Sequence, residues 1–146
     1  MKEENVMYND GIVRCFTEAI SNAIDNFFRS VEGPTPMTRL EVKFDEETQM
    51  IEMINDGNHI PVRVDEEHGL YIPEMVFGYL LSSSNYNDNE NRISSGRNGL
   101  GIKLLNVFSE KFEIECYDKD LDILYKQEWN QNMKLKKVIQ LYFLRK

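Results

Sequence analysis

The sequence predicts an α+β fold, a two-layer sandwich with helices on one face of a mixed or antiparallel sheet. Residues 11–30 contain no proline and repeat apolar side chains at helical spacing. Segments within residues 40–54 and 112–144 instead alternate apolar and polar residues, as half-buried strands do. The chain has 146 residues, 41% apolar and 11% aromatic, which suits one domain with its own core.

Charge and composition exclude several classes of function. With 17 basic and 25 acidic residues, the net charge of −8 argues against a surface devoted to nucleic acid, so any DNA would be held mainly by other parts of a larger protein. The distant Cys15 and Cys116, with His59 and His68, predict neither a disulfide framework nor a metal cluster. The sequence lacks an apolar run of about 18 residues and a signal peptide, so we expect no membrane partner and a location in the nucleus or cytoplasm.

The first predicted helix, residues 11–30, has two distinct faces. Its expected core face consists of Ile12, Phe16, Ala19, Ile20, Ala23 and Phe27. The opposite face carries Glu18, Asn22, Asp25 and Arg29, which lie within a sector of roughly 60° at 100° per residue. These four residues form a polar stripe.

The remaining elements follow from turn residues and alternation. Strands at 40–44 and 50–54 form a hairpin that ends in the turn-forming residues 55–59. Pro73 suits the first turn of a helix that continues through Leu80 and Leu81 and frays over residues 82–85. A helix at 99–110 and strands at 112–116, 123–129 and 138–144 complete the chain.

Glycines in residues 94–103 expose backbone N–H groups just before an apolar helical run. Such a junction favours an anion, and Arg97 and Lys103 add positive charge at its two ends. The preceding segment, 86–98, has one large aliphatic residue, Ile93, so we expect a polar lid that is mobile until a ligand orders it. By itself this pattern is equally consistent with an ordinary connection.

The polar stripe has the chemistry of a phosphate site. A carboxylate such as Glu18 can polarise a water molecule, and the amide oxygen of Asn22 can ligate Mg²⁺. Asn55 or Asp56 could accept a hydrogen bond from an adenine amino group, with Gly57 permitting close approach of the base. The alternatives are a solvated helix face and a plain turn.

Four such segments occur in one order, and together they carry a family resemblance. Glu18-x-x-x-Asn22-Ala23-x-Asp25-Asn26 resembles the motif Glu-x-x-x-Asn-Ala-x-Asp-Asn of type IIA DNA topoisomerase ATPase domains, of the eukaryotic and large-DNA-virus kind. Asn55-Asp56-Gly57 before Ile60-Pro61, and Tyr71-Ile72-Pro73 before Ser83-Ser84-Asn85-Tyr86, are similar to two further motifs of that family. The string Gly96-Arg97-Asn98-Gly99-Leu100-Gly101-Ile102-Lys103 resembles Gly-Arg-Asn-Gly-x-Gly-Ala-Lys, which separates the chain from the related chaperone and mismatch-repair ATPases.

The resemblance, which runs from about Asp10 to Met133, implies a Bergerat-type ATP-binding fold that holds ATP and Mg²⁺. It implies that Glu18 is the catalytic general base, that Asn22 is the metal ligand and that Asn55 meets adenine, with Asp25 and Arg29 at further polar positions. The resemblance also places nucleotide contacts at Ser83, Ser84, Asn85, Gly96, Arg97, Asn98, Gly99, Leu100, Gly101, Ile102 and Lys103.

The implied function is ATP hydrolysis that drives gate closure for DNA strand passage in a larger enzyme. DNA would bind through other domains, and a nucleotide-dependent homodimer is a further partner that the resemblance suggests. We expect residues 1–146 to be one ATPase domain with an ATP lid at 86–98, without the family's N-terminal strap or transducer domain. His59 replaces a family glycine and no threonine follows Thr48. These departures leave open a degenerate nucleotide-binding module with little turnover, or another ATPase of the same superfamily.

Overall fold

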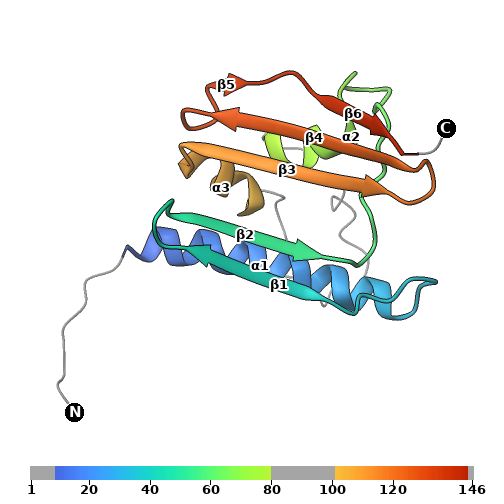
Figure 1. Ribbon diagram of the computed structural model, residues 1–146, viewed down its shortest axis with the longest axis horizontal. Helices are drawn as coiled ribbons and strands as arrows, with labels where there is room; N and C mark the ends of the chain where they lie inside the picture. The colour runs from blue at the N-terminus through green and yellow to red at the C-terminus, as the bar shows by residue number, and fades with distance from the viewer. Residues whose placement is uncertain (1–8, 80–100, 145–146) are drawn as a thin grey trace, which may run out of the picture.

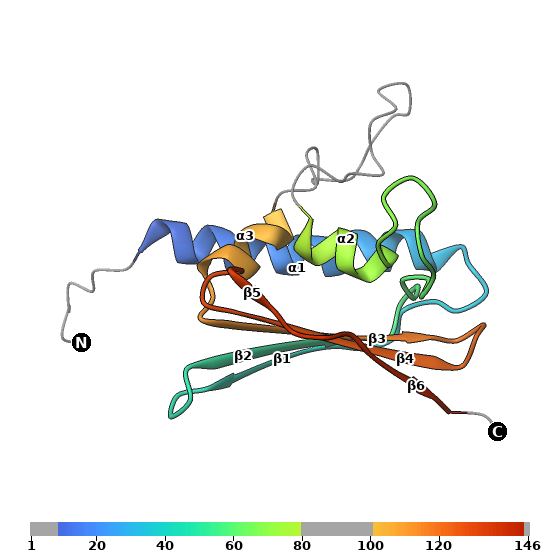
Figure 2. The same ribbon diagram turned by 90° about the horizontal axis from the view of Figure 1, so that it is seen from above.

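The computed structural model describes residues 9–79 and 101–144. In this described part of the chain, three helices lie on one face of a layer of antiparallel strands (Figures 1 and 2). This arrangement confirms the predicted α+β sandwich with helices on one face. Within the described residues, no helix is long and apolar enough to cross a membrane.

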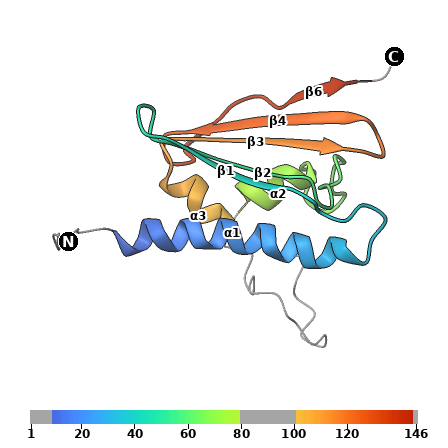
Figure 3. The same cartoon turned by 60° about the horizontal axis from the view of Figure 1, so that its bottom comes forward.

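Helix α1 (Asp10–Val31) is the long helix expected from the apolar periodicity, and Figure 3 shows it running below the other elements. It begins after Asn9, whose side chain accepts a hydrogen bond from the Gly11 backbone N–H at 2.9 Å. At the other end, the buried Ser30 hydroxyl accepts a hydrogen bond from the Met37 N–H at 2.9 Å and so holds the following loop.

Helix α2 (Ile72–Gly78) starts with Pro73 in its first turn, as predicted, but ends before Leu80 and Leu81. Tyr79 has an extended backbone, so the expected continuation is wrong at this residue, and residues 80–85 lie outside the described part. Gly78, the last helical residue, packs so closely on Trp129 that a Cβ there would overlap the indole ring. Helix α3 (Gly101–Phe108) lies beside α2, and the Asn106 side chain donates to the Phe77 carbonyl oxygen at 3.1 Å.

The strands form two antiparallel sheets in one layer. Strands β1 (Leu40–Asp45) and β2 (Met50–Asn55) make the predicted hairpin, in a register that pairs Leu40 with Asn55. Strands β3 (Lys111–Asp118) and β4 (Ile123–Asn130) pair along their full length. Strand β6 (Gln140–Phe143) lies within the strand predicted at 138–144 and pairs with β4. The two-residue β5 (Leu135–Lys136) was not predicted.

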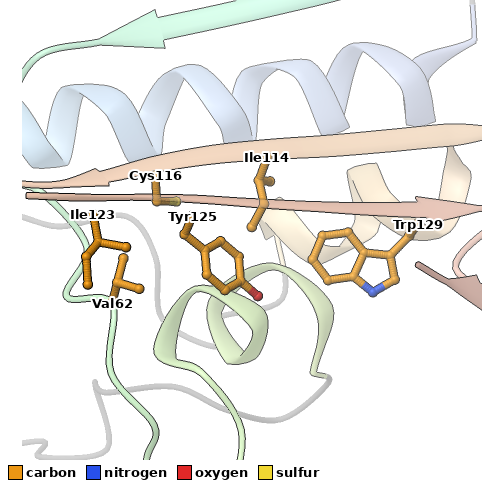
Figure 4. Packing of buried hydrophobic residues seen from close by; sticks show 6 residues of the cluster. All are labelled: Val62, Ile114, Cys116, Ile123, Tyr125 and Trp129. Atoms are coloured by element: carbon orange, nitrogen blue, oxygen red, sulfur yellow. The ribbon is translucent and has the colours of Figure 1, made fainter. Parts of the chain in front are cut away.

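The core lies between the β3–β4 sheet and α2. Alternate residues of β3 and β4 are buried, which is the pattern of a sheet covered on one face. Figure 4 shows these side chains pointing toward α2, together with Val62 from the loop before that helix; the cluster consists of Val62, Ile114, Cys116, Ile123, Tyr125 and Trp129. Burial raises the pKa of the Cys116 thiol to about 12, so this cysteine behaves as an apolar core residue.

The predicted core face of α1 is only partly correct. Ala19 and Ala23 are buried, but Ile12 and Phe27 are 65% and 38% exposed. Among the described elements, α1 makes its main contact with α3, which has 8 residues against the 22 of α1. The strand at 40–44 was expected to be half-buried, but it is largely exposed, since Val42 and Phe44 are 44% and 64% exposed.

Candidate functional site

The polar stripe of α1 faces the start of α3 at Glu18. A Cβ on Gly101, the first residue of α3, would overlap the Glu18 carboxylate. The residue must therefore be glycine for the two helices to approach this closely. Glu18 comes 83 positions before Gly101 in the sequence, so the fold brings the predicted base to the end of the glycine-rich segment.

Two side chains on α1, those of Arg14 and Asn22, contact Glu18. The Arg14 guanidinium lies 2.7 Å from Glu18 Oε1, and the Glu18 side chain is 21% exposed. The Asn22 side-chain nitrogen donates to the Glu18 carbonyl oxygen at 2.8 Å. With its nitrogen held there, Asn22 can present Oδ1 to a cation, one helical turn from the Glu18 carboxylate. An amide oxygen so placed fits the preference of Mg²⁺ for oxygen ligands and leaves the Glu18 carboxylate free to act on water.

A second cluster joins α1 to the turn after β2. The Asn26 side-chain nitrogen donates to Asn55 Oδ1 at 3.0 Å and to the Asn58 carbonyl oxygen at 3.2 Å, while Asn26 Oδ1 accepts from the Asn58 N–H at 3.1 Å. Gly57 lies directly against this amide, because a Cβ there would come within 2.8 Å of Asn26 Nδ2. Asn55 therefore lies beside α1, as it must if one ligand is to contact both Asn55 and the polar stripe.

Asn26 was not among the predicted site residues. Its signal was available, since it closes the Glu-x-x-x-Asn-Ala-x-Asp-Asn motif and lies one turn after Asn22. The residues it contacts are 29 and 32 positions away, however, and no local pattern indicates them. Its hydrogen bonds fix the backbone of the turn that Asn55 begins.

Asp56 has a structural role. Its carboxylate accepts hydrogen bonds from the Thr38 hydroxyl at 2.6 Å and from the Thr38 and Arg39 N–H groups at 2.9 and 2.8 Å. The Thr38 hydroxyl, followed by these backbone donors, lowers the pKa of Asp56 to about 2. Asn55 and Asp56 were the two candidates for contact with adenine. The Asp56 carboxylate is engaged by the loop before β1, whereas Asn55 lies beside α1, so Asn55 is the better candidate.

The other predicted residues of the stripe lie farther along α1. Asp25 is half-buried, and its carbonyl oxygen accepts a hydrogen bond from Arg29 Nε at 3.2 Å. Arg29 is exposed in the last turn of the helix. No contact of the described residues joins Arg29 to Glu18 or Asn55, so its role in the site stays a prediction.

The described end of the glycine-rich string lies in α3. Ile102 is half-buried, whereas the Lys103 side chain is almost wholly buried, with 1% of the residue exposed. Burial lowers the pKa of the Lys103 ammonium. The expected contacts at Ser83, Ser84, Asn85, Gly96, Arg97, Asn98, Gly99 and Leu100, and the lid at 86–98, lie outside the described residues.

His59, which replaces a family glycine, is directed away from the asparagine cluster. Its Nε2 lies 3.4 Å from Asp118 Oδ1 and 3.4 Å from Asp120 Oδ2, in the turn between β3 and β4. Sequence spacing predicted no metal cluster around the histidines, but the fold places three ligand-type side chains together here. The acids are about 60 residues from His59, so spacing alone could not reveal the group.

Comparison with known proteins was made for the whole chain. No family model matches it. The chain is 46% identical over 136 residues to the probable DNA topoisomerase 2 of Dictyostelium discoideum, covering 93% of the chain and 9% of that protein. It is 44% identical over 123 residues to DNA topoisomerase 2 of Candida albicans, covering 84% of the chain and 8% of that protein. The chain thus spans about a tenth of the length of these relatives.

Solved structures agree with the sequence relatives. The ATPase region of Saccharomyces cerevisiae topoisomerase II, crystallised with ICRF-187, superposes with a TM-score of 0.90 at 39% identity, over 99% of this chain and 37% of that one. The ATPase and transducer domains of DNA topoisomerase II from Balamuthia mandrillaris superpose with a TM-score of 0.85 at 38% identity, over 92% of this chain and 33% of that one. By sequence and by fold, the chain belongs to the family of eukaryotic type II DNA topoisomerases and corresponds to part of their ATPase region.

Proposed function

We propose that this chain binds ATP with Mg²⁺ and hydrolyses it as part of a larger type II DNA topoisomerase. The observation that carries the proposal is the contact between Glu18 and Gly101. It puts a carboxylate on α1 against the end of a glycine-rich segment whose amides favour an anion. Membership of the topoisomerase II family supports the same assignment.

The nucleotide would lie along the polar stripe. Its phosphates would meet residues 96–103 and its adenine would meet Asn55, which Asn26 holds beside α1. Ser83, Ser84 and Asn85 would contact the ribose and phosphates. Because Asn55 and Glu18 are both held at α1, one helix would fix the position of the adenine ring relative to the reacting phosphate.

Glu18 is positioned to act as the general base. A water molecule would give a proton to the Glu18 carboxylate while its oxygen attacks the γ-phosphorus, and the bond to the bridging oxygen would break to leave ADP. Asn22 Oδ1 would hold Mg²⁺, which when bound neutralises charge on the phosphate oxygens. Arg14, paired with Glu18, limits the rotamers that this carboxylate can adopt.

DNA would be bound elsewhere in the enzyme. The chain has a net charge of −8 and spans 8% to 11% of the sequence relatives, so the basic surface that DNA needs belongs to the rest of such a protein. We propose that ATP binding favours a homodimer and that hydrolysis drives closure of the gate through which DNA passes. Such an enzyme works where DNA is, in the nucleus or cytoplasm.

The variant Glu18→Gln tests the chemical step. It keeps the size and hydrogen bonding of the side chain but removes the base, so steady-state ATP hydrolysis should fall on the order of 10²-fold with little change in nucleotide affinity. Thr17→Ala is the matched control, because Thr17 adjoins Glu18 in the sequence and bonds only the helix carbonyl oxygens of Val13 and Arg14 in the described structure.

The results separate the alternatives. Equal turnover in Glu18→Gln and Thr17→Ala would show that another group is the base. Nucleotide binding by the unchanged chain without any hydrolysis would contradict the enzymatic part of the proposal and leave a binding module.

A further inference from the structure

Three side chains that the proposed reaction does not use meet at the β3–β4 turn. His59 comes from the loop after β2, Asp118 is the last residue of β3, and Asp120 lies in the turn. The imidazole Nε2 is 3.4 Å from one oxygen of each carboxylate, and the three atoms lie within 4.8 Å of one another. The described residues contain no second group of this kind.

Asp118 is held in place before any ligand arrives. The residue is 2% exposed, and its Oδ2 accepts the Val62 N–H at 2.8 Å while Oδ1 accepts the Asp120 and Leu121 N–H groups at 3.0 Å each. Burial acts to raise the pKa of Asp118, but these three donors outweigh it and the pKa is lowered. A carboxylate fixed by outer hydrogen bonds is typical of metal-ligating acids.

The geometry of this group differs from that of the His68–Asp65 pair. His68 Nδ1 lies 2.8 Å from Asp65 Oδ1, which is the length of a direct hydrogen bond. The two His59 distances are equal and longer, at 3.4 Å. Ligands about 2.0–2.1 Å from a tetrahedral ion lie roughly 3.3 Å apart, and a mixed nitrogen and carboxylate set suits Zn²⁺ better than Mg²⁺ or Ca²⁺.

The neighbouring charge is compatible with a cation. Lys119 lies between the two acids in sequence, but its ammonium is directed to the carbonyl oxygens of Asp56 and Gly57, each at 3.4 Å. The two carboxylates therefore leave a local negative charge next to the imidazole. Since Asp120 is 85% exposed at its side chain, an ion can reach the group from solvent.

We propose that His59, Asp118 and Asp120 bind a Zn²⁺ ion, with a water molecule as the fourth ligand. The ion would join the β3–β4 turn to the loop after β2, two segments about 60 residues apart. That loop begins with the Asn55–Gly57 turn, so the ion would stiffen the side of the molecule where we place adenine.

Titration of the tag-free, nucleotide-free chain with Zn²⁺ against a chromophoric chelator tests the site. We expect one equivalent to bind, with a rise in Tm on the order of 5 °C at saturation. His59→Gln and Asp120→Asn should each weaken binding at least tenfold and abolish the rise in Tm. Asp118 is left unchanged because its carboxylate also holds three backbone N–H groups.

The controls identify the ligands. His68→Gln, the matched change at the other histidine, should bind Zn²⁺ as the unchanged chain does. Co²⁺ in place of Zn²⁺ should give tetrahedral absorption bands without a thiolate charge-transfer band, because no cysteine is among the three proposed ligands. The proposal is overturned if no stoichiometric binding occurs, if His68→Gln removes it, or if the Co²⁺ spectrum indicates cysteine.

Discussion

Gly101 is the residue that allows α3 to approach the Glu18 carboxylate. In Gly101→Ala the new methyl group would overlap that carboxylate, so Glu18 must turn away. We expect ATP hydrolysis to fall by at least about tenfold, although alanine itself favours a helix by roughly 1 kcal/mol. Gly11→Ala is the control, since a Cβ there meets only the capping oxygen of Asn9, at 3.0 Å. Equal hydrolysis rates in the two variants would show that close approach at Gly101 does not serve the reaction.

Asp56 makes stability depend on pH in the acid range. Its pKa falls from 3.8 to about 2 on folding, so its contribution is fully present above pH 3.8 and is lost as the pH falls toward 2. In Asp56→Asn this contribution is absent, and the difference in Tm between the two proteins should narrow between pH 4 and pH 2. Thr38→Val removes the largest cause of the lowered Asp56 pKa, so the pKa of Asp56 in the folded state should be higher in this variant. The contribution of Asp56 to stability should therefore be lost at a higher pH in Thr38→Val than in the unchanged chain. Parallel Tm curves for the unchanged chain and Asp56→Asn would contradict this account.

Among the elements, α2 is tied to β5 by a buried acid. Glu74 on α2 has a side chain that is 7% exposed, and it pairs with Lys136 on β5. Lys136→Met would leave that carboxylate without this partner and should reduce the free energy of unfolding by about 1–3 kcal/mol in denaturant titration. Lys137→Met is the control, because Lys137 is 62% exposed and its partner Glu128 keeps contacts with Lys111 at 3.6 Å and Asn130 at 2.7 Å, so the loss should be smaller. If the free energy of unfolding falls equally in both variants, the Glu74–Lys136 pair does not hold α2 against β5.

At the scale of the whole molecule, sequence patterns predict local structure well and long-range contacts poorly. The periodicities of residues 11–30 and 112–129 reproduce α1, β3 and β4, because each depends on neighbours in the chain. The close packing of Gly78 on Trp129 depends instead on residues far apart in the sequence, as does the contact of Asn26 with the turn at Gly57. The core face predicted for α1 is partly exposed, because its burial depends on which elements cover the helix in the fold and not on the periodicity of the helix itself. The proximity of residues within one motif, such as Glu18 and Asn22, follows from helix geometry, whereas the meeting of His59 with Asp118 does not follow from the sequence.

The central claim is that the stripe on α1 and the segment ending at Gly101 form one nucleotide site. Isothermal titration with a non-hydrolysable ATP analogue tests it directly, since hydrolysis does not contribute to the heat. We predict one binding site in the presence of Mg²⁺, and at least tenfold weaker binding when Mg²⁺ is chelated or in Asn22→Ala, with Thr17→Ala unchanged. Absence of binding by the unchanged chain at millimolar analogue and Mg²⁺, or binding indifferent to Asn22, would contradict the account.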